Sequence, residues 1–206
     1  MIRLITLSVS LMLCFGLSAA HAREAIDVVA ATNHEVLERL GQVKAGKDAE
    51  LVACRIVEEV VLPRLATRSI ARKVLGRHWR SASHVQRRLF TEEFRQYLIR
   101  FYADFIRDFE NNEMEMLETP YHADDDTRLV STRLTSRDNT KTVRMDYRLK
   151  RSDDDWEIVD ILIDGASLVV NNQKRYTRAV AKHGIESVIA TLAKRNAQVF
   201  GDQGES

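Results

Sequence analysis

The spacing of apolar residues changes twice along this chain, from helical to alternating and back to helical. Apolar positions three and four apart predict helices in the first half, over about 23–45, 49–62, 65–75 and 84–110. A period of two then predicts strands over 113–119, 128–136, 142–150 and 155–163. Helical spacing returns over about 171–183 and 185–199. Helices followed by strands and then by helices predict an α+β fold.

The long helix and the last two strands carry the richest apolar surfaces. On the helix, aromatic residues recur in steps of three and four, at Phe90, Phe94, Tyr97, Phe101, Phe105 and Phe109. One strand has a single apolar face, made of Val143, Met145, Tyr147 and Leu149. The last is apolar on both faces, with Trp156, Ile158 and Leu162 on one and Val159, Ile161 and Ile163 on the other. Short polar turns join the strands, so we expect a curved antiparallel sheet of about four strands wrapped by the N-terminal and C-terminal helices.

The first 22 residues are typical of a secretory signal peptide. Arg3 precedes an uncharged apolar run over 4–17, and Ala20-His21-Ala22 forms a cleavage site. We expect cleavage after Ala22, with an uncleaved anchor as the alternative. Cys14 follows a leucine, so it is not expected to be lipidated. The rest is predicted to form one domain over 23–200 and a disordered tail over 201–206.

The composition of the mature chain argues against some classes of binding partner. The full chain has 31 basic and 30 acidic residues, and removal of the signal peptide, which has one arginine, leaves no net charge. Neutrality argues against nucleic acid as a partner, and also against strong attraction to anionic lipid head groups. Cys54 is the only cysteine left, so no intramolecular disulfide can form, and it is predicted to be a small buried residue.

No motif for catalysis or metal binding is complete. Ser167 lacks the second glycine of a nucleophile elbow, and His34-Glu35 is not followed by the second histidine of a zinc protease. The Asp triplets over 124–126 and 153–155 lack the spacing of a calcium loop and are predicted to be turns. We therefore expect no catalytic residue and no metal, although a carboxylate pair formed only by the fold stays open.

Two separated motifs resemble those of a known family. The first is Val74-Leu75-Gly76-Arg77-His78-Trp79-Arg80, followed in the family's order by 86–90, Phe94, Leu98 and 101–103. The second begins with Trp156-Glu157-Ile158-Val159-Asp160-Ile161 and continues through 164–169, Asn171, the aromatic Tyr176 and the run from 184 to 194. Over about 25–198 the chain resembles the MlaC or toluene-tolerance (Ttg2-type) family of periplasmic phospholipid-binding proteins. It departs from the family at Asn172-Gln173, where Tyr-Arg is usual.

The resemblance implies a cone-shaped, nuclear-transport-factor-like fold with an internal apolar cavity. It implies a monomeric periplasmic carrier, not an enzyme, with phospholipid as cargo and no cofactor. The implied partners are an outer-membrane lipoprotein complexed with a porin and an inner-membrane lipid ABC transporter, both in transient contact. Such a carrier maintains the lipid asymmetry of the outer membrane.

The apolar faces and the family turn together suggest the residues that line the cavity. The helices supply Val74, Leu75, Trp79, Phe94, Leu98, Phe101 and Tyr102. The strands supply Val143, Met145, Tyr147, Ile161 and Ile163, and the turn region supplies Leu168, Val170 and Tyr176. Ser167 is expected to cap a helix. Lys174 and Arg175 are candidates for contact with the lipid head group.

Two alternatives stay open at this point. A small hydrolase or isomerase-like enzyme on a similar cone-shaped sheet would need an acid and a base, with Asp146 or Asp160 as candidates. A ligand-free interaction domain would have a solid core and no cavity.

Overall fold

The computed structural model describes residues 24–42, 49–107, 113–117, 122–124, 126–135, 141–152 and 155–201. The predicted signal peptide lies outside the described residues, as do parts of the turns that join the strands and residues 202–206 of the predicted tail.

The first half of the chain is helical, as predicted. Its elements are α1 (Ala25–Gly41), α2 (Ala49–Ile56), the π-helical turn η1 (Val57–Val61), the 3₁₀ turn η2 (Leu62–Arg64), α3 (Thr67–Leu75), α4 (His78–Ser81) and α5 (His84–Arg107). Pro63 lies in the first turn of η2, where its missing N–H costs nothing. Gly76 ends α3 with a positive φ of 55°, which an L side chain rarely adopts.

Two serine caps determine where the long helices begin. At the start of α5, Ser83 and Gln86 form a reciprocal capping box, in which each side chain accepts a hydrogen bond from the other residue's backbone N–H. At the start of α6 (Leu168–His183), the Ser167 hydroxyl accepts from the Val170 N–H at 3.0 Å. The predicted capping role of Ser167 is therefore confirmed. The last helix is α7 (Ile185–Gly201), so the predicted tail begins inside a helix.

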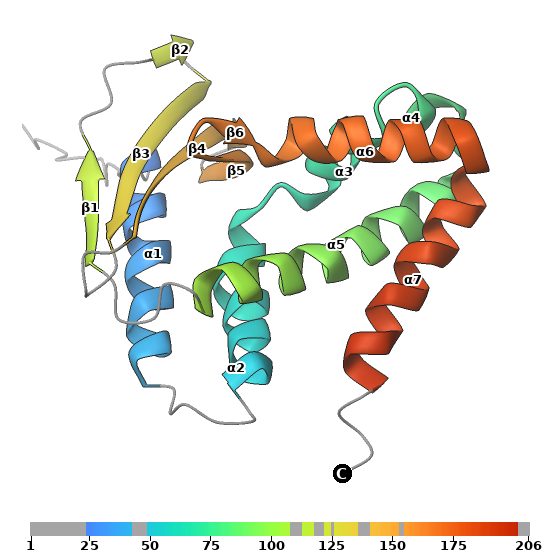
Figure 1. Ribbon diagram of the computed structural model, residues 1–206. Helices are drawn as coiled ribbons and strands as arrows, with labels where there is room; N and C mark the ends of the chain where they lie inside the picture. Colours follow the sequence, from blue (N-terminus) through green and yellow to red (C-terminus); the bar gives the residue numbers. More distant parts are fainter. Residues whose placement is uncertain are drawn as a thin grey trace, which may run out of the picture.

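The strands form the predicted antiparallel meander. They are β1 (Glu113–Leu117), β2 (His122–Asp124), β3 (Thr127–Thr135), β4 (Thr142–Ser152), β5 (Asp155–Ile163) and β6 (Ala166–Ser167). The sheet order is β1-β3-β4-β5-β6, and β2 pairs with β3. Figure 1 shows this curved sheet at one side of the molecule, with α1 beside it and α5 running from the sheet toward α6 and α7. The α+β prediction is confirmed.

One prediction for β5 is wrong. Strict alternation puts Ile158 and Ile161 on opposite faces, but the register with β4 shifts between Arg148 and Leu149. This irregularity pairs Ile158 with Leu149 and Ile161 with Tyr147, so both isoleucines reach the same inner face. A β-bulge adds one residue to one strand and thereby resets which side chains point inward.

Buried apolar residues form two clusters of unequal size. The main core joins the first half of α1, the α2–η1 helix, α3, α5, the inner face of the sheet, α6 and α7, and it includes Phe90, Phe94 and Leu75. The smaller cluster consists of Val36, Leu40, Ile56 and Val60, which come from α1 and from the α2–η1 helix. Cys54 is buried and free, as the sequence predicts.

The main core predicts that alanine substitution of two different leucines changes the stability of the protein by very different amounts. Leu75 is 0% exposed at the end of α3, whereas Leu89 on α5 is 42% exposed. We expect Leu75→Ala to lower the free energy of unfolding by about 3 kcal/mol, because it removes buried methyl groups and leaves a cavity. Leu89→Ala should change it by less than about 0.5 kcal/mol. Denaturant unfolding of both variants checks this, and equal effects would contradict the assignment of the core.

Candidate functional site

A small apolar cavity lies between α1, the second half of α5 and the inner face of the sheet. Its volume is about 60 Å³, which is room for a few water molecules. Helices contribute Thr32, Asn33, Val36, Leu37, Leu40, Val61, Tyr102, Phe105 and Ile106. Strands contribute Met114, Leu134, Met145, Tyr147, Ile158 and Ile161. Almost the whole wall is hydrocarbon, so the cavity suits an apolar ligand.

The cavity lies at the boundary between the two apolar clusters. Val36 and Leu40 on one wall belong to the smaller cluster of α1 and α2–η1. Met145, Tyr147 and Ile161 on the other wall belong to the main core. α1 belongs to both clusters, because Val28 and Val29 in its first half lie in the main core. An opening between the two walls would therefore involve the second half of the helix, where Val36 and Leu40 lie.

One polar pair lies in this apolar wall. The Tyr147 hydroxyl, from β4, donates a hydrogen bond of 3.1 Å to Asn33 Oδ1 on α1. The Asn33 amide nitrogen Nδ2 is buried and has no hydrogen-bond partner among the described residues. Burial raises the pKa of Tyr147 to about 12, so the phenol is neutral at physiological pH. The pair thus leaves the two N–H groups of the Asn33 amide without a partner among the described residues, inside an otherwise apolar space.

A second, narrower cavity of about 10 Å³ lies beside the first, under α3 and the start of α6. Tyr102, Ile158 and Ile161 line both cavities and therefore form the partition between them. The rest of its wall is Leu65, Ile70, Phe94, Leu98, Asp160, Leu168, Val169 and Asn172. Burial also raises the pKa of Tyr102, so this partition carries no charge.

Asp160 is the acidic residue in that second wall, and its contacts are structural. Its carboxylate accepts hydrogen bonds from the Ser167 hydroxyl at 2.7 Å and the Val169 N–H at 3.2 Å. It also pairs with Arg148 at 3.2 Å. These bonds hold the start of α6 against β5, and an anion at a helix N-terminus is favourable.

Asp146, the other carboxylate considered as a catalytic acid or base, also has hydrogen-bond partners. It accepts from the Ser131 hydroxyl at 2.5 Å and from Arg144 at 2.9 Å. It lies opposite Leu162 in the register, on the face of the sheet away from Met145 and Tyr147. Asp146 is therefore not part of the apolar cavity.

Seven of the fifteen sequence-predicted lining residues border the two cavities. They are Phe94, Leu98, Tyr102, Met145, Tyr147, Ile161 and Leu168. Val74 and Leu75 are fully buried in the main core. Phe101, Val143 and Ile163 are partly buried, and Val170 is 42% exposed. The structure places none of these six beside either cavity.

The remaining two predicted residues have other neighbours. Trp79 borders an open polar groove together with Arg68 and Arg72. Tyr176 packs edge-on against Phe90 and Phe94 at ring-centroid distances of 5.6 and 5.8 Å, on the α6–α7 side. Lys174 and Arg175 are exposed on α6, and the Arg175 guanidinium lies 5.6 Å from the Tyr176 ring centroid.

The lining that sequence reasoning missed comes mainly from α1. Val36, Leu37 and Leu40 have helical apolar spacing in the sequence, but that pattern does not distinguish a core from a cavity wall. Ile158 was missed because the register shift in β5 cannot be read from alternation. Met114 and Leu134 lie on the paired strands β1 and β3, in direct register with each other.

Comparisons with known proteins agree on one family. The sequence profile of the family described as MlaC protein matches residues 30–194, which is most of the chain. The chain belongs to the MlaC family. The intermembrane phospholipid transport system binding protein MlaC of Haemophilus influenzae is 19% identical over 145 residues, covering 69% of this chain and 68% of that protein.

A solved structure shares the fold. The phospholipid-binding protein of Ralstonia solanacearum, solved in complex with a phospholipid, superposes with a TM-score of 0.74. It is 24% identical in sequence, and the match covers 85% of this chain and 98% of that one.

Within the described ranges, no helix combines the length and hydrophobicity needed to cross a bilayer. The same part of the chain contains no cluster of three or more histidine, cysteine or acidic side chains that could hold a metal ion.

The buried phenols of the site predict how stability depends on pH. The pKa of Tyr147 rises from about 10 in the unfolded chain to about 12 in the folded one. A raised pKa stabilises the fold below pH 10, and this stabilisation is lost as the pH rises from about 10 through about 12. Tyr147→Phe should reduce the loss over this window by about 2 kcal/mol. Denaturant unfolding at pH 9 to 12 tests this, and an identical loss in both proteins would contradict it.

Proposed function

We propose that this protein is a periplasmic phospholipid carrier. It is exported, cleaved after Ala22, and shuttles lipid between an outer-membrane lipoprotein–porin complex and an inner-membrane lipid ABC transporter. This exchange would maintain the lipid asymmetry of the outer membrane. The observation that carries the proposal is the apolar cavity at the boundary between the two clusters. Membership of the MlaC family and the lipid-bound structural relative support it.

The free energy of burial explains why such a lipid needs a carrier. Each buried methylene contributes about 0.8 kcal/mol, so a chain of about 15 methylenes contributes roughly 12 kcal/mol. Release of the cargo into water is therefore very slow. A bilayer buries the same chains equally well, so transfer between bilayer and protein can be nearly balanced. Carriage needs a path for the chains and no chemical step.

The cavity of about 60 Å³ is far smaller than an acyl chain, so entry of cargo would require its walls to move apart. Cargo would enter as the second half of α1, with Val36 and Leu40, moves away from β4 and β5. If Tyr102 and its partition also moved, the two cavities would join into one elongated space. The first half of α1, with Val28 and Val29, would stay packed in the main core.

The carrier is tested most directly through its cargo. The protein, purified from the periplasm, is extracted with organic solvent, and bound lipid is identified by mass spectrometry. A diacyl lipid in stoichiometric amount supports the proposal. A protein without lipid, even after incubation with phospholipid vesicles, would point to the ligand-free interaction domain instead.

A matched pair of tryptophan variants tests the position of the cavity. Leu37 borders it from α1, whereas Ile26 on the same helix is 49% exposed. We expect Leu37→Trp to fill the space and to reduce bound phospholipid at least about tenfold, since a bulky ring occupies the volume of the chain. Ile26→Trp should keep its lipid. Circular dichroism shows that both variants fold, and equal lipid content in the two would contradict this site.

The unpaired amide of Asn33 suggests how the cargo is positioned. An ester carbonyl of a phospholipid could accept from Asn33 Nδ2, which would satisfy the buried donor. Asn33→Leu should then speed lipid transfer to acceptor vesicles about tenfold, with unfolding free energy changed by only about 1 kcal/mol. Asn171→Leu, on the exposed side of α6, is the control. Unchanged transfer in Asn33→Leu would remove this contact from the proposal.

A further inference from the structure

Positive charge is concentrated at one part of the molecule. Residues 60–91 contain eight lysine and arginine residues and no acidic residue, and residues 165–185 contain four more and again no acidic residue. The first segment includes α3, α4 and the first turns of α5, and the second includes the whole of α6. We call the solvent-exposed surface of these elements the basic face. Since the whole chain has a net charge of only +1, the rest of the molecule is acidic.

The two segments meet in the fold. Gln173 of α6 donates a hydrogen bond of 2.7 Å to the Lys73 carbonyl of α3. A Cβ added at Gly76 would lie 3.3 Å from the methyl group of Thr177, so the helices approach closely there. Figure 1 shows α3, α4 and α6 together at the upper right of the molecule. The cations of both segments therefore share one surface.

The orientation of α6 exposes its cations beside α3. Gln173 and Thr177 face α3, whereas Arg175 and His183 border the groove toward α7. With 3.6 residues per turn, Lys174, Arg178 and Lys182 fall between these two sides. All three are exposed, as are Arg68, Arg72, Lys73, Arg77, Arg80 and Arg88.

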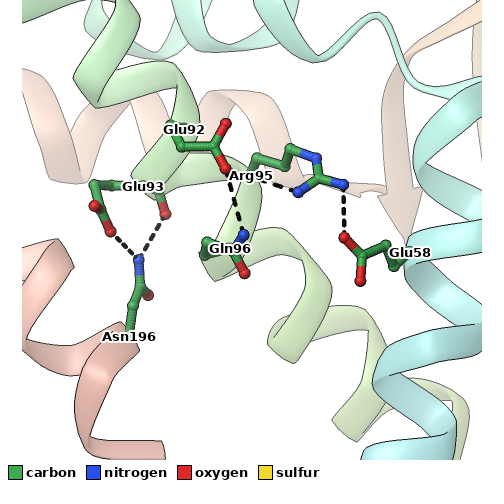
Figure 2. A network of polar contacts seen from close by, with 6 residues as sticks. All are labelled: Glu58, Glu92, Glu93, Arg95, Gln96 and Asn196. Carbon is green, nitrogen blue, oxygen red and sulfur yellow. Dashed lines mark hydrogen bonds and ion pairs between the residues drawn. The ribbon is translucent and has the colours of Figure 1, made fainter. Parts of the chain in front are cut away.

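The cations of the basic face differ in their pairing from several arginines on other helices. On the opposite helices, Arg39 pairs with Glu35 and Glu59 at 2.7 Å each. Figure 2 shows a similar network, in which Arg95 joins Glu58 and Glu92. Among the described residues, none of the twelve cations of the basic segments forms an ion pair. Glu157, beside Arg68 and Arg72, and Glu186, bonded to Gln86, lie at the borders of the face.

Helix ends explain only part of this charge. Arg72, Lys73 and Lys182 lie in the last turns of α3 and α6, where a cation stabilises the helix. Arg68 lies in the first turn of α3, where the helix dipole disfavours a cation. Arg87 also donates hydrogen bonds to the Trp79 and Arg80 carbonyls, and Arg175 lies over the Tyr176 ring. The structure gives no such contact for Arg68, Arg77, Arg88 or Arg178 among the described residues.

Two exposed apolar side chains lie within the basic face. Val85 and Leu89 are 53% and 42% exposed, and they lie one turn apart at the start of α5, with the exposed Arg88 beside them. Cations surrounding exposed apolar side chains are typical of surfaces that contact lipid head groups and the boundary just below them.

We propose that the basic face docks on the anionic surface of a phospholipid bilayer. A bilayer presents phosphate groups across the whole contact area, which matches cations spread over four helices. It also has an apolar layer within reach of Val85 and Leu89. A stable protein interface usually has few charged residues at its centre, whereas here the exposed Arg88 lies directly beside the apolar pair. Docking would bring the carrier to its lipid source without any change in the cavity.

The test uses the purified protein and sedimentation with vesicles of phosphatidylglycerol and phosphatidylcholine in equal parts. We expect binding at low salt that weakens steeply as salt is added, and little binding to pure phosphatidylcholine. Arg77→Glu with Arg178→Glu should weaken binding at least about 25-fold, since each cation near such a surface is worth about fivefold in affinity. Val85→Ser with Leu89→Ser should also weaken binding while leaving its salt dependence in place.

The control is a pair with the same charge change elsewhere. Arg55→Glu with Lys194→Glu alters two exposed cations of α2 and α7, outside the basic face. Equal loss in both pairs would reduce the effect to net charge and overturn the proposal. Absence of vesicle binding would also overturn the proposal. If the variant with Arg77→Glu and Arg178→Glu then lost cross-linking to an acidic protein, the face would be assigned to a protein partner. Bound cargo, measured in every variant, reports separately on the carrier function.

Discussion

The inner face of β4 and β5 is an apolar surface that must be covered, and helices from two overlapping clusters cover it. α3, α5 and α6 belong to the main core. α1 belongs to both clusters, with Val28 in the main core and Val36 and Leu40 in the smaller one. The small cavity bordered by Val36 and Tyr147 lies where the two clusters meet.

Polar contacts keep the rest of the sheet in place around that boundary. Asp160 joins β4, β5 and the start of α6 through Arg148, Ser167 and the Val169 N–H. A buried carboxylate whose oxygens all have hydrogen-bond partners supports the local geometry. Asp160 thereby positions one wall of the second cavity.

The near-neutral composition conceals a separation of charge. Averaged over the chain, 31 basic and 30 acidic residues argue against attraction to anionic lipid. In the fold, the cations of 60–91 and 165–185 gather on one surface, while Arg39 and Arg95 on other helices are neutralised by glutamates. Electrostatic attraction depends on the field near a surface and not on the total charge. A neutral chain can therefore still carry a basic face that attracts anionic lipid.

The sequence by itself determined the elements, their order and the family. Periods of 3.6 and two are local properties, and the capping residues Ser83 and Ser167 mark helix starts within a few positions. Only the tertiary structure decided which apolar residues border empty space. Leu75 and Leu37 look alike in the sequence, but one is packed in the core and the other lines the cavity. Hydrophobicity predicts that a side chain is buried. Which residues it then contacts depends on its neighbours across the fold and on register shifts such as the one beside Ile158.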